Sequence, residues 1–393
     1  MYTNIEFLDT EPIENVITAM HFEMDKVIFF GYEETITEYR KQTEDFLKGK
    51  CKVENVEFYP VSKKSLKKVV NSIKTVLDRE KKEQNHIFFD LTGGESLILV
   101  AFGMLCEAYN AQMHEYDIVN DKLIEMDKES EGRISNVANA KTFELTLDNY
   151  IEMRGAKINH RLDRDFANVN DEEFMHRVRE LWKLMVKYKQ NWNYYTGLIQ
   201  KNFKTETLDA ANTLPKFVAY DFEEFKSFMS DLAEAGIIVN YHAKDTGRLK
   251  ERVQFSFSYA SQALKDCLMK SGTTLELHVY DEMKGSSFHC YESIHIDWDG
   301  VIYGDTRKDV TNEIDVLSIT GNVPMFISCK GGNLSGEAMR DAMYELETVA
   351  KYFGGKYAEK VLATLHPVTG VFKKRADEMG IRLWCCGEEG DVV

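Results

Sequence analysis

The first 126 residues alternate short apolar runs with amphipathic stretches, and this alternation restricts the fold more than any other feature. Apolar runs lie at 5–9, 26–32, 56–61, 86–90, 113–118 and 122–126, and helical patterns lie at 12–20, 33–48, 65–82 and 95–109. Strands that alternate with helices form parallel sheets covered on both faces. The amino-terminal part is therefore predicted to be an α/β domain built on a parallel sheet.

Length and composition predict a soluble protein with two or three domains. The chain has 393 residues, of which 44% are hydrophobic and 29% charged, too many for one ordinary core. No window approaches ~18 uninterrupted apolar residues, so no membrane span is expected. Acidic residues among the first twenty exclude an ordinary signal peptide, and the cytoplasm is the expected location.

Cysteine usage and net charge exclude two further classes. The seven cysteines are odd in number, scattered and without a CxxC pair, which argues against a disulfide framework and a structural zinc site. The net charge of −16 disfavours a broad nonspecific grip on duplex DNA. It does not exclude a nuclease, because a metal ion can neutralise phosphate locally.

The segment DLTGGES at 90–96 lies between a predicted strand and a predicted helix. Paired glycines let backbone N–H groups approach a ligand, and the new helix offers its positive end to a phosphate. Ligands of open parallel sheets sit at such carboxyl-terminal strand ends. The segment is neither a Walker loop nor a GxGxxG motif, and a Gly-Gly turn before a capped helix can also be purely structural.

The middle of the chain has the pattern of a winged helix. Residues 127–141 are polar and are taken as the first boundary. A helical run at 171–195 and a helix at 221–235 precede a predicted β-hairpin, which is typical of winged-helix units. The second helix is acidic and carries one lysine, so a scaffold or dimerisation role is favoured over DNA reading.

The carboxyl-terminal part is predicted to be a mixed sheet flanked by helices. A helix from about 261 carries Glu276 near its end or in the following turn. Strands are expected at 293–297, 312–318, 325–329, 360–365 and 381–385, and a helix at 337–353. Asp315 and Lys330 each interrupt an apolar strand, which is unusual for residues that only face solvent.

Asp315 and Lys330 form the pattern needed for metal-assisted phosphodiester cleavage. The carboxylate can hold a divalent cation, and the lysine can steady the attacking hydroxide or the charge that develops on phosphorus. Strand alternation places Glu313 on the face of Asp315 as a reserve ligand and turns the Cys329 side chain toward the core. Ser328 stands where a strong version of the motif carries an acidic residue.

The spacing of Glu276, Asp315 and Lys330 resembles the PD-(D/E)xK, or restriction-endonuclease-like, superfamily. The resemblance implies Mg²⁺ or Mn²⁺ as cofactor and a lysine that contacts the nucleophilic water. The metal positions that it implies here are Glu276, Asp315, Ser328 and Cys329, and the catalytic set is Glu276, Asp315, Ser328 and Lys330. Because Ser328 replaces a carboxylate with a weaker neutral ligand, the site is either completed by Glu313 or Glu276 or is attenuated.

The amino-terminal part resembles the CARF domain, a Rossmann-like dimeric sensor of cyclic oligoadenylates in type III CRISPR defence. The residues that carry this resemblance, and the implied ligand site, are Asp9, Thr10, Asp90, Leu91, Thr92, Gly93, Gly94, Glu95 and Ser96. The whole order resembles CRISPR ancillary nucleases: a CARF domain at 1–140, a linker and winged-helix-like region at 141–259, and a nuclease domain at 260–393.

The resemblance implies a homodimer that binds cyclic tetra-adenylate and cleaves single-stranded DNA or RNA, or supercoiled plasmid. Gating is expected because a middle domain separates the sensor loop from the catalytic sheet in the sequence. An alternative is a ligand-responsive winged-helix regulator that binds DNA and has an attenuated nuclease domain. A third hypothesis is that the sensor degrades its own ligand.

Overall fold

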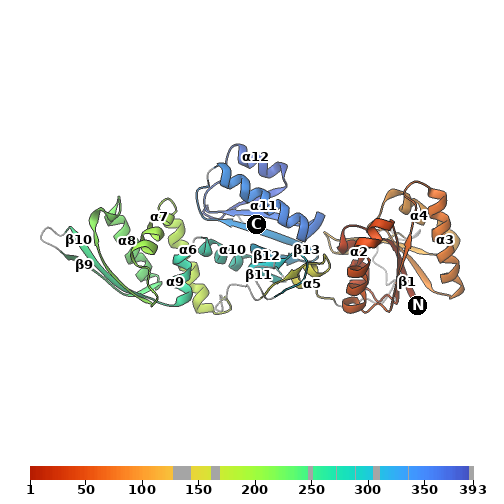
Figure 1. Ribbon diagram of the computed structural model, residues 1–393, viewed down its shortest axis with the longest axis horizontal. Coiled ribbons are helices and arrows are strands. Elements are labelled where there is room, and N and C mark those ends of the chain that lie inside the picture. The colour runs from red at the N-terminus through yellow and green to blue at the C-terminus, as the bar shows by residue number, and fades with distance from the viewer. Residues whose placement is uncertain are drawn as a thin grey trace.

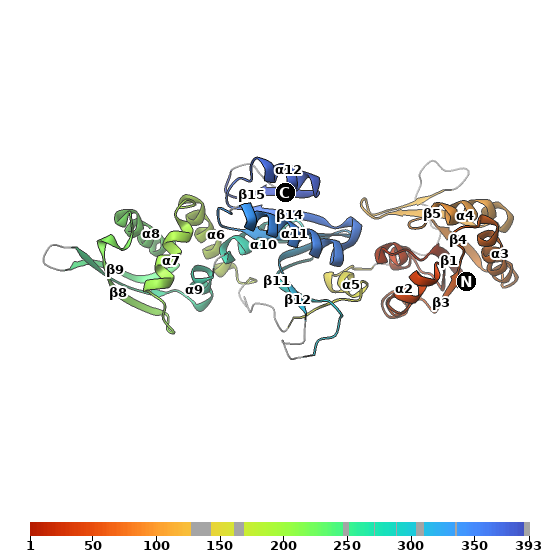
Figure 2. The ribbon, with the colours of Figure 1, turned by 45° about the horizontal axis from the view of Figure 1, so that its top comes forward.

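The computed structural model describes residues 1–126, 143–160, 169–246, 251–270, 272–287, 289–303, 310–334 and 336–388. It has three parts in a row (Figure 1). The amino-terminal domain lies at one end, the carboxyl-terminal sheet in the centre, and helices α7 and α8 with the β9–β10 hairpin at the other end. Figure 2 shows the same order from another side. The boundary predicted at 127–141 lies outside the described residues.

The amino-terminal sheet has the strand order β3-β2-β1-β4-β5-β6. Its first five strands are parallel and β6 is antiparallel to β5. Strands β1, β2 and β4 are almost fully buried because helices cover both faces of the sheet. The predicted alternation is confirmed. The elements are β1 Tyr2–Phe7, η1 Pro12–Asn15, α1 Ile17–His21, β2 Lys26–Gly31, α2 Glu33–Phe46, η2 Leu47–Cys51, β3 Asn55–Pro60, α3 Leu66–Lys82, β4 His86–Asp90, α4 Ser96–Tyr109, β5 Gln112–Asp117 and β6 Lys122–Glu125.

The middle part packs helices against a three-stranded antiparallel sheet of order β8-β10-β9. Its elements are α6 Glu172–Lys187, α7 Trp192–Asn202, β8 Asp209–Pro215, η3 Lys216–Val218, α8 Phe222–Glu234, β9 Ile238–Thr246 and β10 Arg252–Tyr259. The single helix predicted at 171–195 is wrong, because the chain turns between α6 and α7. Asn191 in this turn donates to Glu224 and Tyr188 donates to Asp231, so both ends of the turn are tied to α8.

The carboxyl-terminal sheet has the order β15-β14-β13-β12-β11-β7. Strands β13, β14 and β15 are parallel, and the other neighbours pair antiparallel. The elements of this part are α5 Leu147–Glu152, β7 Lys157–Ile158, α9 Gln262–Met269, α10 Thr273–Lys284, β11 His289–Asp297, β12 Thr311–Thr320, β13 Val323–Lys330, α11 Gly336–Gly354, η4 Gly355–Tyr357, β14 Glu359–Thr364, α12 Val371–Glu378 and β15 Ile381–Cys385. Residues 143–160, assigned from the sequence to the linker region, therefore supply a helix and an edge strand to this part.

Glu276 differs from its predicted position near the end of a helix. The segment after Ser261 forms two helices, and Glu276 lies in the first turn of the second one, α10. The break falls at Gly272, whose φ of +94° is a conformation that side chains rarely adopt. Helix α9 ends at Met269, and Gly272 is the residue immediately before the first turn of α10.

The central position of the carboxyl-terminal sheet corrects one sequence-based expectation. The middle part does not separate the amino-terminal domain from the carboxyl-terminal sheet, because it lies on the far side of that sheet (Figures 1 and 2). One continuous apolar core joins Val27 and Phe29 of the first sheet to Leu317 and Phe326 of the third. The amino-terminal domain and the carboxyl-terminal part therefore share one core, to which helix α5 contributes Leu147, Tyr150 and Ile151.

The structure also gives a result on membrane spans. Among the described residues, none of the helices combines the length and the apolar character that crossing a bilayer requires.

Candidate nuclease site and sensor loop

The candidate nuclease site lies where strands β12 and β13 stop pairing with each other. Their register runs from Thr320 opposite Val323 to Val316 opposite Ile327, and no further. Just past the last pair, the Asp315 carboxylate accepts a hydrogen bond from the Cys329 backbone N–H at 2.6 Å. The Asp315 side chain of β12 therefore accepts the N–H of β13 that a backbone carbonyl would otherwise accept. This hydrogen bond fixes the carboxylate between the two strands.

Lys330 and Ser328 share the same carboxylate oxygen. The Lys330 Nζ lies 3.5 Å from Asp315 Oδ2, and the Ser328 hydroxyl donates to that oxygen at 3.3 Å. The side chains of Lys330 and Asp315 are 28% and 19% exposed, so both are accessible to solvent. The predicted pairing of acid and lysine is present in the structure.

A cavity of about 240 Å³ opens beside these residues, under helix α11. Its polar lining consists of Glu313, Asp315, Ser328, Lys330 and Glu345, and its apolar lining of Ile314, Phe326, Ile327, Leu346 and Val349. Glu313, predicted as a reserve ligand, does line the cavity and accepts from the Ser293 hydroxyl at 2.8 Å. Glu345 was not predicted, because only the packing of α11 across the sheet brings it to this cavity.

Glu276 and Cys329 lie on the other side of the sheet from this cavity. Helix α10 and Cys329 belong to the apolar core that includes Val316 and Ile327, whereas α11 belongs to the core of Leu317 and Phe326. Burial raises the pKa of the Cys329 thiol well above its ordinary value, and the charges of Asp315 and Glu276 raise it further. A buried, protonated thiol is a poor metal ligand.

The donor set of the cavity fits a hard divalent cation. Three carboxylates are the oxygen ligands that Mg²⁺ and Mn²⁺ prefer. In the described part of the chain, no three His, Cys, Asp or Glu side chains are already gathered closely enough to hold an ion. The residue types therefore suit the metal, and Glu276 and Cys329 as ligands remain predictions.

The predicted sensor loop lies at the carboxyl ends of the neighbouring strands β1 and β4. Asp90 is buried, and its carboxylate accepts from the Thr18 hydroxyl at 2.5 Å and from the Thr92 N–H at 2.9 Å. Burial opposes its ionisation, but the nearby His114 and these hydrogen bonds prevail and lower the pKa of Asp90 to about 2. The hydrogen bond from the Thr92 N–H to Asp90 therefore stabilises the conformation of the loop.

The two glycines of this loop are required by close approach and by backbone conformation. A Cβ at Gly93 would lie 2.9 Å from the Glu14 carboxylate and 3.4 Å from the Asp9 side chain, and Gly94 has a φ of +122°. The turn after β1 and the turn after β4 are thus in contact. Of the other predicted ligand residues, Thr10, Glu95 and Ser96 are exposed, and Asp9, Leu91 and Thr92 are partly buried.

Polar contacts connect the turn after β1 directly to the carboxyl-terminal part. Glu11 forms a buried ion pair with Arg154 and accepts from the Lys356 backbone N–H at 2.9 Å. Glu14 pairs with the Lys356 ammonium and accepts from the Tyr357 hydroxyl at 2.5 Å. Lys356 and Tyr357 belong to η4, which directly follows α11.

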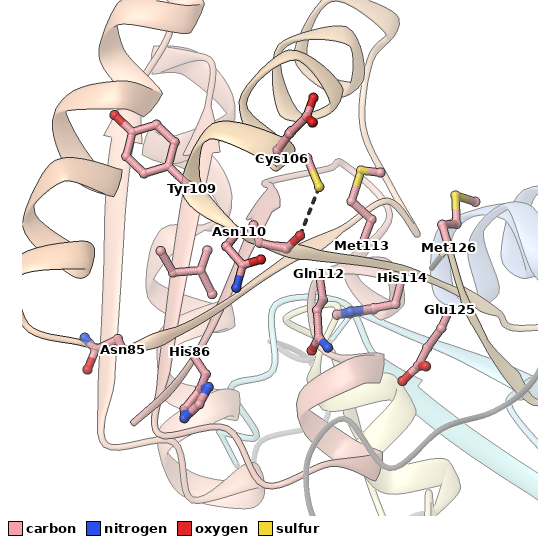
Figure 3. Close-up of a pocket in the computed structure, with 13 residues that line it drawn as sticks. Asn85, His86, Cys106, Tyr109, Asn110, Gln112, Met113, His114, Glu125 and Met126 are labelled. Carbon is pink, nitrogen blue, oxygen red and sulfur yellow. Dashed lines mark hydrogen bonds between the residues drawn. The ribbon is translucent and has the colours of Figure 1, made fainter. Parts of the chain in front are cut away.

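A larger cavity, of about 450 Å³, lies in the amino-terminal domain away from this loop (Figure 3). It opens at the other end of the strands, where β4 starts at His86 but β5 starts only at the level of Phe88. Figure 3 shows residues of β4, α4, β5 and β6 around it. The Cys106 thiol donates a hydrogen bond to the Ala111 carbonyl oxygen at 3.0 Å. The predicted ligand residues do not line this cavity.

Comparison with known proteins agrees with this arrangement. Residues 265–393 match the Card1-like endonuclease domain. This match contains Glu276, Asp315, Lys330 and Glu345. Among curated proteins, no sequence matches the chain significantly.

Two solved structures share the fold over nearly the whole chain. The crystal structure of protein VC1899 from Vibrio cholerae is 17% identical, with a TM-score of 0.69, and the match covers 97% of this chain and 93% of that one. Can2 from Sulfobacillus thermosulfidooxidans, in complex with cyclic tetra-adenylate, is 16% identical, with a TM-score of 0.67 and coverage of 98% and 94%. The endonuclease match confirms the predicted nuclease resemblance of the carboxyl-terminal part, and the two structures confirm the predicted α/β fold of the chain.

Proposed function

We propose that this chain is a metal-dependent nuclease that a cyclic oligoadenylate, cyclic tetra-adenylate in particular, activates in type III CRISPR defence. One observation carries the proposal: Asp315 and Lys330 face each other beside a cavity, at a split strand pair, in a domain that matches an endonuclease family. Mg²⁺ or Mn²⁺ is the proposed cofactor and the cytoplasm the proposed location.

The cavity residues can divide the work of phosphodiester hydrolysis. In the reaction a water oxygen bonds to phosphorus, one phosphorus–oxygen bond breaks, and the leaving oxygen takes up a proton. When bound, the metal would polarise the phosphate and the attacking water. Asp315 would hold that ion, while the Lys330 ammonium would stabilise the negative charge that grows on the phosphoryl oxygens.

A second groove in the same domain suits a nucleic-acid strand. It has a volume of about 350 Å³ between α11 and α12, and it is lined by Arg340, Lys374 and Arg375 with one acidic residue, Glu378. Arg375 lies over the ring of Tyr344, which also lines the groove. This excess of positive charge, in a chain whose net charge is −16, supports DNA or RNA as the substrate.

Helix α4 supports the proposed homodimer. The helix is apolar on nearly all sides, and Ile98, Ala101 and Phe102 are buried on its inner side. On its outer side Val100 and Met104 are 51% and 60% exposed. An apolar helix that is covered on one side only is a natural interface. The adjacent loop 90–96 of two subunits would then lie near one two-fold axis, where one cyclic ligand could contact both.

Glu14 offers a route by which the ligand could control the cavity. Its carboxylate lies against Gly93 of the sensor loop and also holds Lys356 and Tyr357, which follow α11. Burial raises the pKa of Glu14, with Lys356 opposing. A phosphate bound at the loop would repel this carboxylate and shift its contacts with η4, which directly follows α11. Glu345, Leu346 and Val349 of that helix line the nuclease cavity.

Cleavage assays with Lys330→Ala test the catalytic part of this proposal. Purified protein would be incubated with single-stranded DNA, single-stranded RNA and supercoiled plasmid in Mn²⁺ and cyclic tetra-adenylate. We expect product from at least one substrate and a loss on the order of 100-fold or more in the variant, because a cation at the developing charge is removed. Undiminished cleavage by Lys330→Ala would contradict the assignment, and chromatography of the recovered ligand would reveal a sensor that degrades it.

A further inference from the structure

Strand β13 lacks a charged metal ligand at the place opposite Asp315. Ser328 occupies this place, and its hydroxyl donates a hydrogen bond to Asp315 Oδ2. A hydroxyl that donates to the carboxylate is neutral and can add little to the binding of a divalent cation. The cation site that the proposed function requires is therefore short of one carboxylate on the strands.

Glu345 brings a carboxylate to the same cavity from helix α11. The helix buries Ala342, Leu346 and Val349 against the sheet, and this packing holds Glu345 at the cavity wall. Glu313, on the opposite wall, already accepts from Ser293. In the described part of the chain, Glu345 makes no hydrogen bond or ion pair, so its oxygens are available to a cation.

The charge of the cavity also favours a divalent cation as its ligand. Glu313, Asp315 and Glu345 oppose the single ammonium of Lys330, which gives a formal charge of −2 when all are ionised. A phosphodiester adds a further negative charge, and like charges at close range repel strongly. A divalent cation between the carboxylates removes this repulsion.

We propose that Glu345 is a metal ligand of the nuclease site and replaces the carboxylate that Ser328 does not supply. The inference rests on the proposed function and names a residue of that site outside the two strands. It also answers the question that Ser328 raises, because a helix carboxylate in the cavity can supply the missing charge. Glu345 reaches the ion together with Asp315, and Ser328 remains a hydrogen-bond donor to Asp315.

Mn²⁺ binding to the full-length protein without nucleic acid tests this inference separately from cleavage. Electron paramagnetic resonance measures free Mn²⁺ during a titration. We expect Glu345→Gln to weaken Mn²⁺ binding at least about 10-fold, because even outer partners of a metal site contribute 10- to 100-fold. Glu337→Gln is the matched control: this residue is on the same helix, its side chain is 82% exposed, and it does not line the cavity. It should leave the affinity unchanged.

A rescue variant excludes a purely structural effect. Ser328→Glu combined with Glu345→Gln returns a carboxylate to the strand and should restore most of the lost affinity. Wild-type affinity in Glu345→Gln, equal losses in Glu345→Gln and Glu337→Gln, or no Mn²⁺ binding by the wild type would overturn the inference. A selective loss of Mn²⁺ binding in Glu345→Gln, in a protein that cleaves no substrate, would support this ligand and contradict the proposed nuclease function.

Discussion

Asp315→Asn is expected to reduce the rate of ligand-activated cleavage by at least about 100-fold, because the site loses its central carboxylate. The amide has the same shape, and its oxygen can still accept the hydrogen bond that Cys329 N–H donates in the wild type. The fold should therefore persist, which thermal unfolding would check. The measurement is the initial rate with a labelled single strand in saturating Mn²⁺.

Asp377→Asn is a matched control for this variant. Asp377 lies on α12 in the same domain, is exposed, and does not line the nuclease cavity. It should cleave at the wild-type rate. Equal rates for Asp315→Asn and the wild type would show that the strand gap is not the reaction centre, and the nuclease site would have to be sought elsewhere in the chain.

Arg154→Ala is expected to cost about 3–5 kcal/mol of stability, the typical price of removing one partner from a buried ion pair. The side chains of Arg154 and Glu11 are each only 8% exposed, and they join the nuclease part to the turn after β1. The substitution leaves the Glu11 charge buried without its strongest partner. Because Glu11 lies three residues before Glu14, the response of cleavage to the ligand should weaken as well.

Calorimetric unfolding of the full-length protein measures the stability part of this prediction. Lys63→Ala serves as control, because it removes one partner of an exposed ion pair with Glu34. Such surface pairs contribute at most about 1 kcal/mol. Arg154→Ala should lower the unfolding temperature much more than Lys63→Ala does. If both variants lower it by the same small amount, this ion pair does not stabilise the contact between the amino-terminal domain and the carboxyl-terminal part.

Local patterns in the sequence predicted much of the amino-terminal domain. In residues 1–126 the spacing of apolar residues distinguishes strands from helices. The order of the elements and the position of the loop 90–96 therefore follow from local sequence alone. Asp315 and Lys330 were also predictable, because a charged residue in an apolar strand is conspicuous. The break at Gly272 was missed, since one glycine in a helical pattern is compatible with either a stop or a continuous helix.

Features that depend on tertiary packing could not be read from the sequence. Glu345 resembles any exposed helical glutamate until α11 is laid across β12 and β13. The ion pair of Glu11 with Arg154 joins residues 143 positions apart. The sequence order also suggested a middle domain between sensor and nuclease, whereas the chain passes through the central sheet with β7 before it forms the middle part. Only the folded chain brings Glu11 and Glu14 into contact with Arg154 and η4.

The most direct measurement of the central claim is the rate of single-strand cleavage by the wild-type protein in Mn²⁺, with and without cyclic tetra-adenylate. If the sensor loop controls the cavity through Glu14 and the end of α11, the ligand should raise the rate about 10-fold or more, since coupling free energies of roughly 1–3 kcal/mol are usual. Equal rates with and without the ligand would contradict the account, whether or not the protein cleaves.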